Sequence, residues 1–288
     1  MGRGLVLFGC GLAASSAAAA PRDVQIRSIH FATGVIELHN YGAASEALSG
    51  WSFCTHDENQ IRLYTNPGGF SGVVVAPGAS LFVHFANDAP PLPEHVNRSS
   101  LGLFATPLDN GAYSMQLYFA PVNFEDGNTI ADHLQWSPGG ADHTVADERS
   151  DEAVAGGVWT NESAWIATSA GTTALRLLDV SGGVLHGPGD YAALDVMPDC
   201  NENFIDDFFD IADGRSQDAN SDGVPDECQP PDCPDLDGNG LVDLTDLALL
   251  LANFGLTGPD LPGDVDDDLD VDLTDLALLL AAFGAACP

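Results

Sequence analysis

Residues 243–255 read DLTDLALLLANFG, and residues 272–284 repeat them as DLTDLALLLAAFG, with one change from asparagine to alanine. The two copies begin 29 positions apart. Leucine and phenylalanine recur at intervals of three or four residues, which places them on one face of a helix. In the first copy these residues are Leu247, Leu250, Leu251 and Phe254. The duplication therefore predicts two equivalent short helices.

An aspartate-rich loop precedes each predicted helix. Oxygen-bearing side chains stand at positions 1, 3, 5, 9 and 12 of both loops, and position 7 offers a backbone carbonyl, as in the loop of an EF-hand. The residues in this register are Asp235, Asp237, Asn239, Leu241, Asp243 and Asp246 in the first loop, and Asp264, Asp266, Asp268, Asp270, Asp272 and Asp275 in the second. Because Ca²⁺ prefers oxygen ligands, we expect each loop to bind one calcium ion.

The two loops differ at position 6, where an EF-hand loop turns sharply. Gly240 occupies this position in the first loop, and Leu269 occupies it in the second. A left-handed turn at a residue other than glycine costs about 1 to 2 kcal/mol. We therefore expect the second loop to bind calcium more weakly, although Asp267 adds a further carboxylate nearby.

A calcium loop followed at once by a helix is half of an EF-hand, and residues 235–283 resemble a dockerin module in both loops and both helices. The resemblance implies docking onto a cohesin-like partner, or onto another extracellular or envelope protein, through the residues that open each helix. Those positions hold Leu244, Thr245, Leu273 and Thr274. We assign residues 231–288 to this small α-helical domain. Cys233 and Cys287 bracket it, and we expect a disulfide between them.

The acidic segment before this domain, residues 198–230, contains two similar stretches, DCNENFI at 199–205 and DANSDGV at 218–224. Their alternating oxygen side chains suit a hard cation. We favour the second stretch, because Gly223 stands where the first stretch has Phe204. Its candidate metal ligands are Asp218, Asn220 and Asp222. The alternative is a disordered acidic linker.

These stretches resemble thrombospondin type 3-like calcium repeats in which each repeat carries two cysteines. Two of the four cysteine positions hold Phe209 and Ala219 here, whereas Cys200 and Cys228 remain. If such repeats pair their cysteines crosswise, the resemblance implies a disulfide between the two that remain. The leftover cysteine is then Cys54, which we expect to be a reduced core residue.

The charge of the chain points to the same kind of ligand. Its formal net charge is −35, from 43 acidic and 8 basic residues, and the C-terminal third from Asp199 onward holds more than half of the acids and one basic residue, Arg215. Nucleic acid is excluded as a ligand class, because binding it requires many basic side chains. Divalent cations are favoured.

Residues 1–20 have the pattern of a secretory signal peptide, with Arg3, a short apolar run and an alanine string ending at Ala20. A buried N-terminal helix and, around Cys10, a lipoprotein signal are the alternatives. No later stretch reaches the length of a membrane span. We expect a secreted or cell-surface protein without a transmembrane anchor.

Residues 21–197 predict a mainly β structure, because short apolar or alternating runs are separated by turn clusters such as NPGG at 66–69 and SPGG at 137–140. The spacing is typical of an antiparallel sandwich. The order of IELHN at 36–40, LSGWSF at 48–53 and APGASL at 76–81 resembles the lamin-tail domain. The resemblance implies an immunoglobulin-like β-sandwich that binds or scaffolds rather than catalyses.

The β region contains no recognisable catalytic motif. His133 and His143 each follow an aspartate, but neighbouring residues on a strand point to opposite faces, so we interpret them as polar residues near strand ends. We therefore predict that the chain is not an enzyme.

Three functions fit these features. The first is an exported scaffolding or adhesion protein that docks through its calcium-binding module. The second is a subunit, catalytic or not, of an extracellular polysaccharide-degrading assembly. The third is a calcium-rigidified cell-envelope protein without a docking partner.

Overall fold

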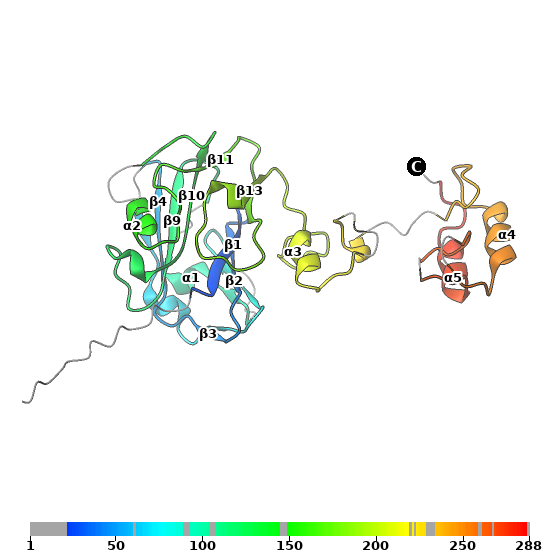
Figure 1. The fold of residues 1–288 in the computed structure, drawn as a ribbon, viewed down its shortest axis with the longest axis horizontal. Coiled ribbons are helices and arrows are strands. Elements are labelled where there is room, and N and C mark those ends of the chain that lie inside the picture. Colours follow the sequence, from blue (N-terminus) through cyan, green and yellow to red (C-terminus); the bar gives the residue numbers. More distant parts are fainter. Residues whose placement is uncertain are drawn as a thin grey trace, which may run out of the picture. The chain divides into compact units, whose positions relative to one another are not determined.

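The computed structural model describes residues 22–59, 62–88, 93–103, 108–144, 149–218, 221, 223–228, 234–258, 261–266 and 268–286. The chain divides into two compact units, residues 1–197 and 198–288 (Figure 1). We call the first the β-rich unit. The division falls where the sequence analysis separates the β region from the acidic region.

The β-rich unit contains two large sheets and one short strand pair. The six-stranded sheet has the order β13-β12-β1-β2-β7-β8, the five-stranded sheet has the order β11-β10-β9-β4-β5, and β3 pairs with β6. The strands are β1 (Val24–His30), β2 (Val35–Asn40), β3 (Glu46–Ala47), β4 (Ser52–Asp57), β5 (Arg62–Tyr64), β6 (Val74–Val75), β7 (Ser80–His84), β8 (His95–Val96), β9 (Tyr113–Tyr118), β10 (Ile130–Pro138), β11 (Ile166–Thr168), β12 (Ala174–Leu177) and β13 (Tyr191–Leu194). The mainly β prediction is confirmed.

The strands pair antiparallel except at two places, which the sequence analysis did not anticipate. β8 lies parallel to β7, and β11 lies parallel to β10. A tight hairpin can only reverse the chain, whereas a long connection lets it return in the same direction. One such connection joins β7 to β8. The other joins β10 to β11 and contains the helix α2 (Ser150–Ala155).

Aromatic side chains fill the space between the two large sheets. Phe53 of β4 packs edge to face on Phe85, next to β7, with ring centroids 5.4 Å apart. Phe31, next to β1, packs on Trp136 of β10 at 5.5 Å. Trp51 is buried after a turn at Gly50, whose φ is 86°. A glycine is needed there because the left-handed conformation is costly for other residues.

Short helices complete the β-rich unit, and the second unit is helical. The β-rich unit holds α1 (Arg98–Leu101), α2 and three 3₁₀ turns, η1 (Pro67–Phe70), η2 (Gly127–Thr129) and η3 (Pro188–Asp190). The second unit holds α3 (Asp207–Ala212), η4 (Asp226–Cys228), α4 (Leu244–Asn253) and α5 (Leu273–Ala281). Among the described residues, none of the helices has the length and apolar character needed to cross a bilayer.

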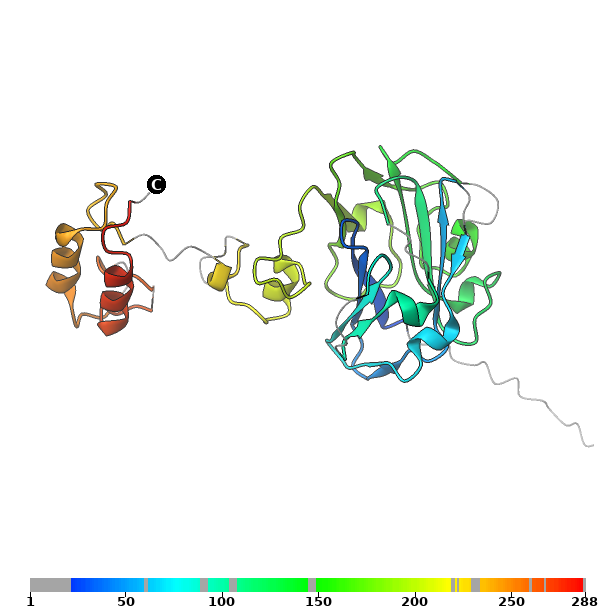
Figure 2. The same cartoon turned by 180° about the vertical axis from the view of Figure 1, so that it is seen from behind.

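The two helices α4 and α5 lie side by side and enclose a very small core (Figures 1 and 2). Its fully buried residues are Val242, Leu250, Val271 and Leu279. We call residues 234–286 the helix pair. The predicted apolar face is partly wrong, since Leu251 is 53% and Phe254 42% exposed. Two packed helices bury only a narrow stripe of each other, and Leu251 lies beyond that stripe.

The backbone segment ahead of each helix pairs with the segment that follows the other helix. The backbone of Val242, ahead of α4, pairs with Gly284 and Ala285, which follow α5. In the same way Val271, ahead of α5, pairs with Gly255 and Leu256, which follow α4. The end of each loop is therefore held by the chain that leaves the other helix.

Candidate metal centres

The first loop of the helix pair is folded around the carboxylate of Asp235. The backbone N–H of Asn239 donates to Asp235 Oδ1 at 3.1 Å, and that of Gly240 donates to Oδ2 at 2.6 Å. Asn239 Oδ1 in turn accepts from the N–H of Leu241 at 3.0 Å. Gly240 has a φ of 85°, the left-handed turn that position 6 requires. These bonds fold the loop around the side-chain oxygens of positions 1 and 5.

Asp246 closes the first loop from the first turn of α4. Its carboxylate is buried and accepts the N–H of Asp237 at 3.1 Å and of Asp243 at 2.7 Å. Asp243 caps the helix by accepting the N–H of Thr245 at 2.6 Å. Burial disfavours the charged carboxylate, but the N–H donors outweigh it and lower the pKa of Asp246. The group is thus held as an anion at the start of the helix.

The second loop repeats this geometry. Asp264 accepts the N–H of Asp268 and of Leu269, each at 3.1 Å, and Leu269 adopts the left-handed turn with a φ of 72°. Asp275, buried at the start of α5, accepts the N–H of Val265 at 2.6 Å and of Asp272 at 2.7 Å. Both loops therefore make the left-handed turn at position 6, with glycine in the first and leucine in the second.

Carboxylate oxygens converge in both loops. Oxygens of three residues lie within 4.8 Å of one another in each group, which is close enough for a single ion. The groups are Asp235, Asp237 and Asp246 in the first loop, and Asp264, Asp266 and Asp275 with the overlapping set Asp270, Asp272 and Asp275 in the second. Oxygen donors without nitrogen or sulfur fit a hard cation such as Ca²⁺.

The second loop has more charge to neutralise than the first. Burial, followed by the charges of Asp275 and Asp268, raises the pKa of Asp266. Burial and the neighbouring Asp268 and Asp272 likewise raise the pKa of Asp270. Repulsion among carboxylates opposes the ion-free loop, and a cation would relieve it.

The residues expected to contact a partner lie on the surface at the start of the helices. Leu244 is 71% and Leu273 70% exposed, far more than leucine usually is. Thr245 and Thr274 are exposed as well. The two helices present these residues equivalently.

The structure describes some of the residues that were predicted to form sites in segment 198–230. Cys200 and Cys228 form the expected disulfide, and Cys54 is a free, buried thiol, so both predictions are confirmed. Asp218 accepts the N–H of Gly223 at 3.0 Å, as Asp235 does from Gly240. Asn220, Asp222, Cys233, Cys287, Asp267 and the proposed signal peptide lie outside the described residues.

The sequence analysis missed two buried acids in this segment. Asp207 and Asp210 belong to α3, at the distances from Asp199 that correspond to positions 9 and 12 of the other loops. The spacing would have revealed them if the register of the helix pair had been laid on residues 199–210. Asp207 also lies within 4.8 Å of the sulfurs of Cys200 and Cys228, but disulfide sulfurs do not ligate a metal as thiolates do, so these three residues form no metal site.

The acid and histidine pairs of the β-rich unit have structural partners. Asp132 and His133 lie inside β10 and are buried, so their interpretation as residues near a strand end is wrong. Asp132 Oδ2 accepts the N–H of Ile26 at 2.7 Å, and its Oδ1 lies 3.3 Å from His186 Nδ1. The register of β1 shifts next to Ile26, which frees this N–H for a side chain of the facing sheet.

His133 takes part in a separate buried network on the other face of β10. Its Nδ1 lies 3.0 Å from Gln116 Nε2, and its Nε2 lies 3.0 Å from Gln135 Oε1. Burial lowers the pKa of His133 to about 4, so the ring is neutral near pH 7. A neutral imidazole bonded on both nitrogens is a packing element of the sheet.

Comparison with protein-family models and with curated proteins finds no match for this chain. The assignment of function therefore rests on the residues described above.

Proposed function

We propose that this chain is an exported, non-catalytic scaffolding or adhesion protein that binds calcium in the helix pair and docks onto a partner through it. The observation that supports this most is the duplicated convergence of three carboxylates at the start of two helices. Each of those helices begins with an exposed leucine. The dockerin-like sequence pattern supports a cohesin-like partner.

The finer classification of the two units belongs to the same proposal. Two large facing sheets support an immunoglobulin-like sandwich for the β-rich unit. Two loops, each followed at once by a helix, support a dockerin-like helix pair. In this proposal the β-rich unit is the part that is displayed, and the helix pair is the part that attaches.

The absence of catalysis is supported by how the polar residues of the β-rich unit are engaged. Asp132 is paired with His186 and with a backbone N–H, and His133 is bonded to two glutamines. We expect no hydrolysis of polysaccharides or peptides by residues 21–197. Turnover that disappears on substitution of one Asp, Glu or His in that unit would contradict this.

Calcium binding is tested on the full chain. We expect the helical circular dichroism of the helix pair to fall when a chelator removes calcium, because four buried core residues cannot offset the repulsion of the carboxylates. Asp246→Ala combined with Asp275→Ala should give the chelated spectrum even in calcium. Asp195→Ala, an exposed acid of the β-rich unit, is the matched control. A helical signal that chelation leaves unchanged would sink the calcium proposal.

Docking is tested by retention on an immobilised cohesin-like protein, with and without calcium. Because Leu244 and Leu273 are equivalent, either single substitution by Asp should leave retention largely intact, and the double substitution should abolish it. Both leucines are exposed, so the double variant should still bind calcium. Wild-type protein that shows no calcium-dependent retention would rule out this class of partner.

A further inference from the structure

Residues 199–205 have the hydrogen-bond pattern of the first half of the two candidate metal loops, although phenylalanine stands at the turn. The N–H groups of Asn203 and Phe204 donate to the two oxygens of Asp199, at 3.0 and 2.9 Å. The N–H of Ile205 donates to Asn203 Oδ1 at 2.7 Å, as that of Leu241 does to Asn239. Phe204 has a φ of 72°, the same value as Leu269.

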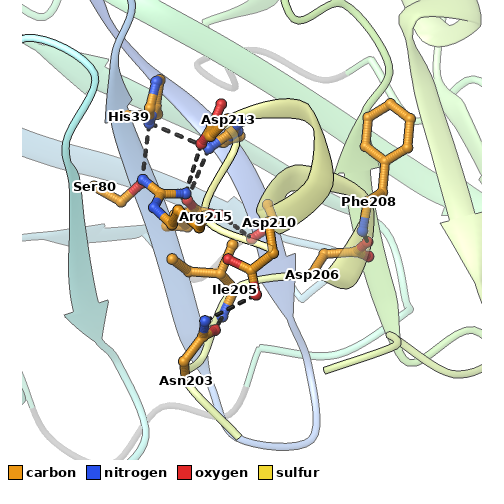
Figure 3. A network of polar contacts seen from close by, with 12 residues as sticks. His39, Ser80, Asn203, Ile205, Asp206, Phe208, Asp210, Asp213 and Arg215 are labelled. Carbon is orange, nitrogen blue, oxygen red and sulfur yellow. Dashed lines mark hydrogen bonds and ion pairs between the residues drawn. The ribbon is translucent and has the colours of Figure 1, made fainter. Parts of the chain in front are cut away.

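A buried carboxylate oxygen without a hydrogen-bond partner points into this loop. Asp210 is fully buried, and its Oδ2 accepts from Asn203 Nδ2 at 2.8 Å, as Figure 3 shows. The same oxygen accepts from Asn201 Nδ2 at 3.1 Å. Within the described part of the chain, the Oδ1 of Asp210 has no hydrogen-bond partner. A buried anionic oxygen costs several kcal/mol unless something compensates its charge. Asn203 links this carboxylate to that of Asp199, because its Nδ2 donates to Asp210 and its backbone N–H donates to Asp199, so a cation bound between the two acids would compensate both.

The Cys200–Cys228 disulfide is attached to this loop at its second residue. The N–H of Cys200 donates to Asp207 Oδ1 at 2.9 Å, and a carboxylate oxygen of Asp207 lies within 4.8 Å of both sulfurs. Asp207 opens α3, the helix that carries Asp210. At the other end of the bridge, Glu227 accepts from Ser216 Oγ and, at 3.5 Å, from Asn201 Nδ2. The bridge therefore holds the loop and α3 in register.

We propose that residues 199–210 form a further site for a hard divalent cation such as Ca²⁺, and that the Cys200–Cys228 disulfide sets its affinity. The ligands are the side-chain oxygens of Asp199, Asn201, Asn203 and Asp210 and the backbone carbonyl of Ile205. With the bridge closed, the ligands are held near one point before the ion arrives. With the bridge open, the ion has to order the loop by itself and binds more weakly. The site is then strong only where disulfides persist.

The site is separate from those of the helix pair, so it can be tested with the latter disabled. The probe is Ca²⁺ itself, added to the full chain carrying Asp246→Ala and Asp275→Ala, which together remove one member of every carboxylate group in the helix pair. Native mass spectrometry counts the bound ions, and calorimetry measures the affinity of each step. All four tryptophans lie in the β-rich unit, so their fluorescence reports whether that unit remains folded. A failure of the helix-pair proposal leaves this measurement unaffected.

Asp210→Asn should remove one calcium ion or weaken its binding at least tenfold. Asp213→Asn, an acid of the same segment that pairs with Arg215, is the matched control and should keep the ion. Equal stoichiometry and affinity in Asp210→Asn and the parent would overturn the site.

Cys200→Ser combined with Cys228→Ser should weaken the same step about tenfold or more. If this variant fails to fold, Asp207→Ala is the substitute, because it keeps the disulfide but removes the hydrogen bond from the N–H of Cys200 to Asp207. It should lower the calcium affinity by the same factor. If either variant folds and keeps the calcium affinity of the parent, the proposal that the disulfide sets the affinity of this site is wrong.

Discussion

Leu269→Gly isolates the contribution of one backbone conformation to calcium affinity. Leu269 holds a φ of 72°, and its side chain is 57% exposed. Replacing a left-handed leucine by glycine removes backbone strain and stabilises the folded loop by about 1 to 2 kcal/mol. Glycine also raises the conformational entropy of the unfolded chain, which opposes folding by about 0.4 to 1 kcal/mol. The exposed side chain loses little burial. The net gain is about 1 kcal/mol, which is roughly a fivefold increase in affinity when ion binding drives folding of the loop.

Calorimetry on the full chain, with calcium as titrant, measures this change directly. Gly240→Leu is the matched converse in the first loop, where φ is 85°, and it should weaken that loop by at least as much. The comparison uses changes within a loop, because the loops also differ in charge: Asp268 and Asp270 of the second stand where the first has Asn239 and Leu241. If Leu269→Gly leaves its step unchanged and Gly240→Leu does no harm, the strain at position 6 does not control affinity.

Two predictions concern the stability of the β-rich unit, measured by urea unfolding followed by tryptophan fluorescence. Burial opposes protonation of His186, but the hydrogen bond and charge of Asp132 outweigh it and raise the pKa of His186. A histidine whose pKa is raised by folding stabilises the folded state fully below about pH 6.5, and this stabilisation is lost as the pH rises through the pKa of the folded state. The free energy of unfolding should therefore fall over that pH range in the parent and should not fall in His186→Gln. An identical profile in His186→Gln would show that this histidine is not charged in the folded state. Burial lowers the pKa of His133 to about 4, so its effect on stability runs in the opposite direction with pH: the free energy of unfolding falls as the pH drops from about 6.5 to 4. The loss amounts to about 3 kcal/mol, and His133→Gln should flatten the acid limb; a limb that stays equally steep would contradict this.

The sequence predicted the parts of the fold that depend on local pattern. The repeated text and its apolar residues at intervals of three or four led directly to α4 and α5, because helical periodicity acts within a few residues. The Cys200–Cys228 pairing, which the structure confirms, was implied by the resemblance to thrombospondin type 3-like repeats rather than by a local pattern. The β region was predicted as mainly β, because alternating runs and turns are local features too.

Features that depend on distant segments could not be read in the same way. The parallel edge pairs β7–β8 and β10–β11 depend on the paths of long connections. The partnership of Asp132 with Ile26 and His186 joins segments far apart in the chain. Leu251 had the apolar character of a core residue, but the narrow contact between two helices leaves it exposed.

The missed acids Asp207 and Asp210 show a different limit. The bulky Phe204 at position 6 argued against a metal loop at residues 199–210, since a left-handed turn is costly there. That cost is one term among several. In the structure the N–H of Phe204 still donates to Asp199, as the N–H groups of Gly240 and Leu269 do to their own loops' first aspartates. The spacing of oxygen-bearing side chains thus predicts the conformation of these loops better than the residue at the turn does.

The exchange between the two halves of the helix pair links its folding to both loops. Val242 follows the turn of the first loop, but its backbone partners follow α5, and Val271 has the converse arrangement with residues after α4. Both valines also belong to the four-residue buried core. Neither half can therefore complete its core or its backbone pairing alone. In the proposed calcium-bound state, an ion that orders one loop would also order the chain that supports the other, so we expect the repeat to fold as one unit.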